Sequence, residues 1–223
     1  VTGNKNDAFG YNAGASITTG TSNTCLGTQT MDSLTTGNYN VAIGVAALQA
    51  IGDDSNNVAV GYRALYNSTV SNNTAVGRDA LYADTTGTEN VAVGQNALYS
   101  NTTADENTAV GYQALYNNTT GENNTAVGRK ALLDVSTGSY NSAFGRDAGF
   151  AITTGIKNTA IGRSAGNTTT TGDNNSSLGF NAQHPSATSS NNVTLGDSNI
   201  AALRCNQTSI SSLSDGRDKT DVV

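Results

Sequence analysis

The sequence is poor in the residues on which most catalytic and metal sites depend. It has no tryptophan, one proline, one histidine and two cysteines, and only 13% of its 223 residues are charged. A single histidine, His184, with no cysteine or second histidine nearby, excludes a zinc site. Cys25 and Cys205 are separated by nine or more repeats, so we expect no disulfide between them. These gaps in composition argue against a cofactor, and we predict none.

Charge and hydrophobicity set further limits on partners. The net charge is −6 at pH 7 and the isoelectric point is near 4.5, which provides no electrostatic footprint for nucleic acid or an anionic membrane. No run of 18 apolar residues occurs, so the sequence contains no candidate membrane-spanning helix. Gly, Asn, Thr and Ala dominate instead, and they do so in strict register.

A repeat of 17 residues runs along almost the whole chain. Each copy contains the pattern Asn-x-small-apolar-Gly, as in Asn107-Thr-Ala-Val-Gly111, and one step, from Gly61 to Gly77, is 16 residues long. The closing glycines of the twelve copies are Gly10, Gly27, Gly44, Gly61, Gly77, Gly94, Gly111, Gly128, Gly145, Gly162, Gly179 and Gly196. A fixed period this short predicts a solenoid, here an all-β parallel solenoid of about twelve 17-residue turns.

Two neighbouring columns of the repeat predict a strand with opposite faces. The residue before each glycine is always apolar, and the residue before that is Ala in nine copies and Cys25, Ser177 or Thr194 in the others. Adjacent residues of a strand point to opposite sides. We therefore expect the small column, Cys25 included, to line a narrow interior. The large apolar column then needs cover from outside the coil.

The remaining columns suggest corners and a second segment. The opening Asn suits a corner because it tolerates left-handed backbone and bonds to its own backbone. The closing Gly suits a second corner or a close backbone approach. After it comes x-x-Ala-Leu, as in Ala114-Leu115, which is too short for its period to distinguish a strand from a helical turn. A polar turn such as Thr119-Thr120-Gly121 completes the copy.

The apolar content of each turn is small and favours self-association. Ordering one residue costs roughly 1–2 kcal/mol of backbone entropy, whereas a buried methylene contributes about 0.8 kcal/mol. A copy with about four apolar side chains, two of them usually Ala, leaves a single chain marginal. We therefore expect a homo-oligomer.

The unit Asn107-Thr-Ala-Val-Gly-Tyr-Gln-Ala114 resembles the head repeat of trimeric autotransporter adhesins, with a longer turn. This resemblance covers about nine-tenths of the chain. It implies a left-handed parallel β-roll associated as a homotrimer, and a role at the bacterial cell surface in which the chain is an adhesin head.

The end of the chain has a second resemblance. The segment from Leu195 through Ser214-Asp-Gly-Arg-Asp-Lys219 is similar to the junction between phage tail fibres and the endosialidase-type intramolecular chaperone. That resemblance implies self-cleavage by Ser214 and Lys219 at the Ser214–Asp215 bond. It divides the chain into a repeat array (1–200), a linker or strand segment (201–213) and the start of a chaperone-like domain (214–223).

Other candidate residues have ordinary structural interpretations. We expect His184 in an exposed turn and the acidic pairs Asp53-Asp54 and Asp105-Glu106, like Asp173, in solvated turns without a metal ion. Several tyrosines flank the Ala-Leu segment and either shield the rim of the core or form a stripe for glycan stacking. They are Tyr62, Tyr66, Tyr82, Tyr99, Tyr112 and Tyr116.

Three function classes follow from these patterns. The first is a structural fibre, the shaft or distal part of a phage tail fibre involved in host attachment, located in the virion tail outside the cell. The second is a bacterial surface adhesin head. The third, an enzyme of polysaccharide cleavage, needs a carboxylate cluster that the columns lack, so apart from self-cleavage we predict no enzyme. The expected partners are copies of the chain and a host cell-surface glycan or protein receptor.

Overall fold

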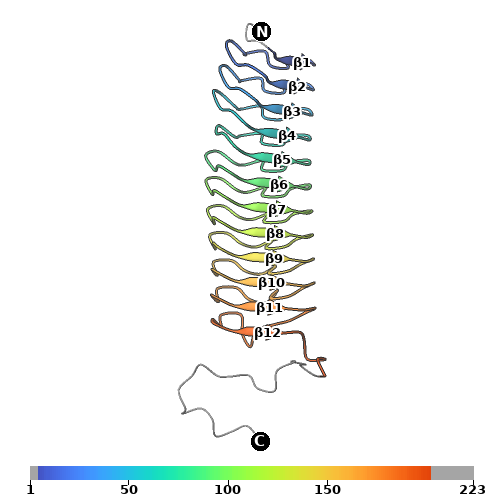
Figure 1. The fold of residues 1–223 in the computed structure, drawn as a ribbon, viewed down its shortest axis with the longest axis vertical. Helices are drawn as coiled ribbons and strands as arrows, with labels where there is room; N and C mark the ends of the chain where they lie inside the picture. Colours follow the sequence, from blue (N-terminus) through green and yellow to red (C-terminus); the bar gives the residue numbers. More distant parts are fainter. Residues whose placement is uncertain (1–4, 202–223) are drawn as a thin grey trace, which may run out of the picture.

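The computed structural model describes residues 5–201, and these residues form one parallel β-solenoid. Twelve three-residue strands stack in chain order into a single sheet, with about eleven turns of coil between the first and the last (Figure 1). They are β1 (Asp7–Phe9), β2 (Thr24–Leu26), β3 (Val41–Ile43), β4 (Val58–Val60), β5 (Thr74–Val76), β6 (Val91–Val93), β7 (Thr108–Val110), β8 (Thr125–Val127), β9 (Ser142–Phe144), β10 (Thr159–Ile161), β11 (Ser176–Leu178) and β12 (Val193–Leu195). The predicted all-β parallel solenoid is confirmed.

The register follows the repeat throughout the sheet. Thr108 pairs with Thr125 and Val110 with Val127, so equivalent residues of successive copies lie side by side. The 16-residue step is absorbed in the turn between β4 and β5, because Val58 still pairs with Thr74. A shortened surface turn therefore leaves the sheet intact, as expected for a segment outside the ladder.

Each strand separates an inward residue from two outward ones. The central small residue, such as Ala109, is fully buried, whereas the flanking Thr108 and Val110 are half-buried. This alternation follows from the two-residue period of a strand. The predicted opposite orientation of the small and large columns is confirmed, and Cys25 is a buried free thiol.

The Ala-Leu segment is neither a strand nor a helical turn. Gln113 and Leu115 both adopt left-handed backbone, with φ near 55° and 50°, on either side of Ala114. Left-handed backbone disfavours bulky residues, but here it turns Leu115 into the interior, where it is fully buried. The amide of Leu115 donates to the carbonyl of Ala131 in the next turn at 3.0 Å. Interior packing and this ladder offset the strain.

The opening asparagines form a continuous internal ladder. The Asn107 Oδ1 accepts the backbone N–H of Asn124 at 2.9 Å, and its Nδ2 donates to the Gly121 carbonyl at 2.9 Å. The corner residue in left-handed backbone is the preceding one, here Glu106 with φ 58°. The structural role predicted for the Asn was therefore wrong in detail: its side chain points inward and satisfies buried backbone groups of its neighbours.

Candidate functional site

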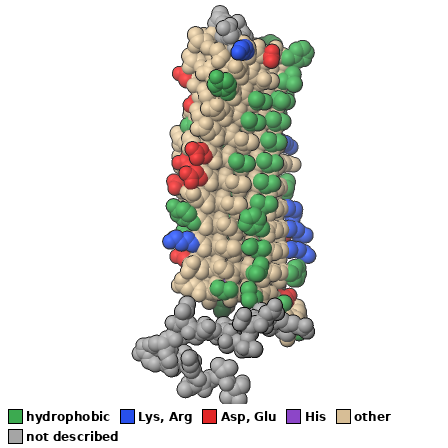
Figure 2. Space-filling view, in the orientation of Figure 1, with side chains coloured by type: hydrophobic (Ala, Val, Ile, Leu, Met, Phe, Trp, Pro, Cys, Tyr) green, Lys and Arg blue, Asp and Glu red, His purple; other side chains and the backbone are tan. Residues whose placement is uncertain are grey.

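The outward face of the sheet carries a row of large apolar side chains from end to end. Along β9, β10 and β11 the residues before glycine, Phe144, Ile161 and Leu178, are 43%, 41% and 51% exposed. Figure 2 shows hydrophobic side chains in rows along the length of the rod. Monomeric soluble proteins seldom expose contiguous apolar surface on this scale, and such patches mark interaction sites.

The prediction that this column is buried concerns an assembled form. In the single chain Val93, Val110 and Val127 are half-buried. The outward direction of the column agrees with the need for cover from outside the coil. The chain itself does not provide that cover within the described residues.

Four of the tyrosines flanking the Ala-Leu segment stack on one another. The rings of Tyr66, Tyr82, Tyr99 and Tyr116 are 5.1–5.3 Å apart between centroids and nearly parallel. Each inner ring is therefore covered on both faces by its neighbours. Sugar stacking needs an open ring face, so within this ladder only the end rings could offer one. Of the two interpretations, shielding of the core rim fits this ladder better.

Buried polar residues interrupt the apolar interior in the middle of the array. One interior column holds Ile17, Leu34 and Ile51, then changes to polar residues, and returns to Val135 and Ile152. The polar members between Ile51 and Val135 are fully buried and are Ser68, Asp84, Asn101 and Asn118. These four positions were not identified from the sequence, although reading this column through the repeat would have shown the change.

The carboxylate of Asp84 accepts four hydrogen bonds from neighbouring side chains and one backbone amide. Its Oδ1 accepts from Asn101 Nδ2 and the Gly87 amide, both at 3.1 Å, and its Oδ2 from Ser68 Oγ at 3.2 Å and Asn73 Nδ2 at 3.3 Å. Burial nevertheless raises the pKa of Asp84 to about 7, because removal from water disfavours the ionised form.

His184 is buried, so the prediction of an exposed turn residue was wrong. Its Nε2 lies 2.7 Å from Ser177 Oγ, and its Nδ1 lies 3.1 Å from Thr194 Oγ1. Ser177 and Thr194 are the last two members of the small column, where they stand in place of Ala. The histidine therefore fills the interior between two hydroxyls, and burial lowers its pKa.

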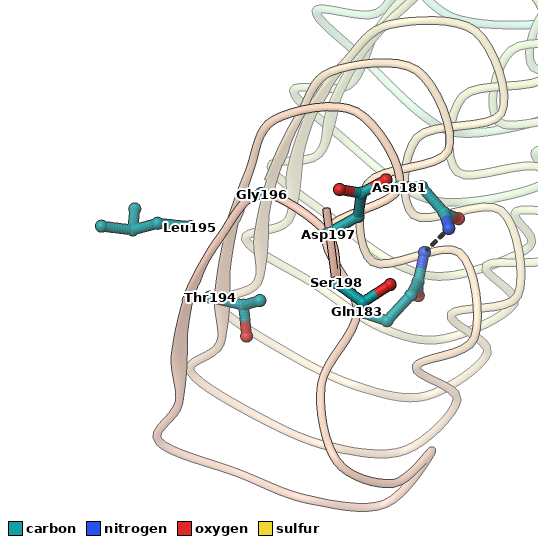
Figure 3. Close-up of a pocket in the computed structure, with 7 residues that line it drawn as sticks. All are labelled: Asn181, Gln183, Thr194, Leu195, Gly196, Asp197 and Ser198. Carbon is teal, nitrogen blue, oxygen red and sulfur yellow. Dashed lines mark hydrogen bonds between the residues drawn. The ribbon is translucent and has the colours of Figure 1, made fainter. Parts of the chain in front are cut away.

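A hollow lies at each end of the described array. The one beside β12 is lined by Asn181, Gln183, Thr194, Asp197 and Ser198, among others, and Gln183 Nε2 donates to Asn181 Oδ1 at 3.3 Å (Figure 3). The other lies beside β1 and β2. Both occur where the stacking of the described strands stops, so they are open ends of the coil.

The remaining candidates from the sequence either form no metal-binding group or lie outside the described residues. Ser214 and Lys219 lie outside residues 5–201, as do the segments 202–213 and 214–223 and Cys205. Within the described part, no group of three His, Cys, Asp or Glu side chains could hold a metal ion. No helix of residues 5–201 has the length and apolar character needed to cross a membrane.

Comparison with known proteins identifies no relative of this chain. No protein-family model matches the chain, and neither a curated protein nor a solved structure is significantly similar to it.

Proposed function

We propose that the chain is a structural segment of an extracellular fibre, the shaft or distal part of a phage tail fibre involved in host attachment. The observation that carries the proposal is the row of apolar side chains that follows the outward sheet face from β1 to β12. A rod with one apolar side along its whole length suits lateral packing with copies of itself, because every turn then contributes equally to the interface.

The proposed assembly is a homotrimer held together along these strand faces. The interior of each turn buries mainly two small residues and one Leu, as in Ala109, Ala114 and Leu115. Full burial of a Val or Ile side chain contributes about 1.5–3 kcal/mol relative to exposure, and covering the outward Val or Ile of each turn would add the part of this that half-burial in the single chain leaves unrealised. Repeated over the array, this contribution stabilises a bundle far more than a single rod.

Sedimentation of the purified chain tests the assembly. We expect a species with three times the 22.7 kDa mass of the chain, and its thermal midpoint should rise with protein concentration because dissociation accompanies unfolding. A folded monomer at micromolar concentration would contradict the proposed trimer. Attachment is tested separately, by measuring whether the purified chain competes with intact particles for host cells.

A further inference from the structure

The position directly after each closing glycine changes character in the second half of the array. We call these residues the post-glycine column, and in order along the chain it reads Tyr11, Thr28, Val45, Tyr62, Arg78, Gln95, Tyr112, Arg129, Arg146, Arg163, Phe180 and Asp197. The fold accepts apolar, polar and aromatic side chains here, so it does not require arginine. Three consecutive turns nevertheless carry one, and we call Arg129, Arg146 and Arg163 the arginine column.

The backbone holds the arginine column in register. The amide of Asp147 donates to the Arg129 carbonyl, that of Ser164 to the Arg146 carbonyl, and that of Asn181 to the Arg163 carbonyl, each at 2.9 Å. Adjacent strands lie roughly 4.8 Å apart, so the three guanidinium groups emerge at regular short intervals from a rigid support. Figure 2 shows Lys and Arg side chains gathered in the lower half of the rod, along the edge of the apolar rows.

Few acidic side chains among the described residues neutralise these charges. Asp147 is shared by Arg146 Nε at 2.9 Å and Arg129 Nη1 at 3.9 Å. Arg163 forms no ion pair with any described residue and instead lies over the Phe180 ring, 5.5 Å from its centroid. All three arginines are exposed. Like charges held side by side on neighbouring turns repel each other, as they do on neighbouring strands, and a bound anion would relieve that repulsion.

Aromatic rings border the arginine column at both ends. Tyr112 occupies the preceding turn and is 41% exposed, and Phe180 occupies the following turn and is 57% exposed. Arg129 lies 5.9 Å from the centroid of the Tyr112 ring. Guanidinium groups pair with carboxylates and sulfates through two parallel hydrogen bonds, while exposed rings offer apolar faces to sugars.

We propose that the arginine column, with Tyr112 and Phe180, binds a linear acidic polysaccharide. The proposal deepens the attachment role and rests on the proposed function for its biological setting. The rest of the chain favours this partner over nucleic acid, because a net charge of −6 repels a polymer with one charge per roughly 1.7 Å. A polysaccharide with more widely spaced carboxylates or sulfates suits three arginines between two rings.

Binding of the whole chain to defined polymers tests the proposal. Immobilised polygalacturonate, dextran sulfate and neutral dextran serve as the probes. We expect binding to at least one acidic polymer, weakened by salt, and none to neutral dextran. Preference for polygalacturonate or dextran sulfate identifies the group as carboxylate or sulfate. Binding to neither acidic polymer, or equal binding to neutral dextran, would overturn the proposal.

Two matched pairs of variants locate the site. Arg163→Gln should weaken binding about tenfold, the loss of one charge-assisted contact. Lys157→Gln, which removes the same charge before the start of β10 rather than after its end, should leave binding unchanged. Asp147→Asn removes the only carboxylate paired with the arginine column among the described residues and should strengthen binding several-fold, whereas Glu122→Gln should not.

The outcomes of these experiments distinguish a failure of the polysaccharide site from a failure of the proposed trimer. Equal loss in Arg163→Gln and Lys157→Gln, or equal gain in Asp147→Asn and Glu122→Gln, would show a general charge effect and refute the site, and so would no gain in Asp147→Asn. Arg163→Gln that changes the sedimenting mass would instead make the arginine column a contact between copies, which also overturns it. A trimer that ignores acidic polymers contradicts only this inference, and a monomer that binds them contradicts only the trimer.

Discussion

Asp84 occupies an interior position that Leu34 and Ile51 fill in earlier turns. Its pKa of about 7 exceeds the ordinary value of 3.8, so the folded state binds a proton more tightly than the unfolded state does. The associated stability is fully present below pH 3.8 and is lost as the pH rises through 7. The difference corresponds to on the order of 4 kcal/mol.

Asp84→Asn should therefore remove the pH dependence of folding stability that the buried Asp84 carboxyl causes. The introduced amide would continue the side-chain ladder of Asn101 and Asn118 without a buried charge, so we expect the thermal midpoint of this variant to exceed that of the unmodified chain at pH 8. At pH 4 the two midpoints should converge. The comparison isolates Asp84, because the opposite contribution of His184, whose pKa is lowered by burial, is common to both proteins. A constant difference across the pH range would disprove the assignment.

The turn between strand and Ala-Leu segment depends on the closing glycine. Gly111 has φ 138°, and a Cβ built on it would lie 2.5 Å from the carbonyl oxygen of Gly128 in the next turn. The two turns thus approach too closely for any side chain, and the backbone conformation is one that other residues rarely adopt.

Gly111→Ala should lower the free energy of unfolding by about 3 kcal/mol or more, since strain and a backbone clash combine. Gly52→Ala is the matched control: a Cβ at Gly52 meets nothing within 4 Å, and its φ lies outside the left-handed region. We expect the control to leave chemical denaturation midpoints unchanged or slightly raised. Equal effects of the two substitutions would show that the close approach is unimportant.

At the scale of strands and turns, the sequence predicts most of the fold. The alternation of Ala109 and Val110 is sufficient to orient the two faces of a strand, because a strand has a period of two. The alternating left-handed residues around Ala114 could not be predicted, because they follow neither helix nor strand period. His184 was misassigned because Gln183-His-Pro185 locally resembles a turn, whereas its partners Ser177 and Thr194 lie in other parts of the repeat.

The candidate surfaces were less predictable than the fold. The apolar column before glycine is uniform along the chain, so its outward direction and need of cover could be inferred from the pattern. The arginine column and Asp84 occupy variable positions of the repeat, and each becomes visible only when that position is followed through successive copies. Ser214 and Lys219 were assigned by resemblance alone, and their assignment stays a prediction.

The described residues form a rod with one apolar side, and the proposed assembly depends on that side. Val93 and Val110 lie next to each other on β6 and β7 and point outward. In a single chain, aspartates at these positions can remain solvated. In a trimer packed along the strand faces they would be desolvated without partners, at a cost of several kcal/mol.

The double variant Val93→Asp/Val110→Asp should therefore abolish the trimer in sedimentation experiments. Thr103→Asp/Thr120→Asp adds the same charges at exposed positions of two adjacent turns outside the strands, and it should still sediment as a trimer. The control matters because the chain already carries a net charge of −6, and general repulsion between copies would weaken both variants alike. If the valine variant alone dissociates, the strand face is the interface. If it remains trimeric, the copies meet elsewhere and the apolar row is left without the role proposed for it.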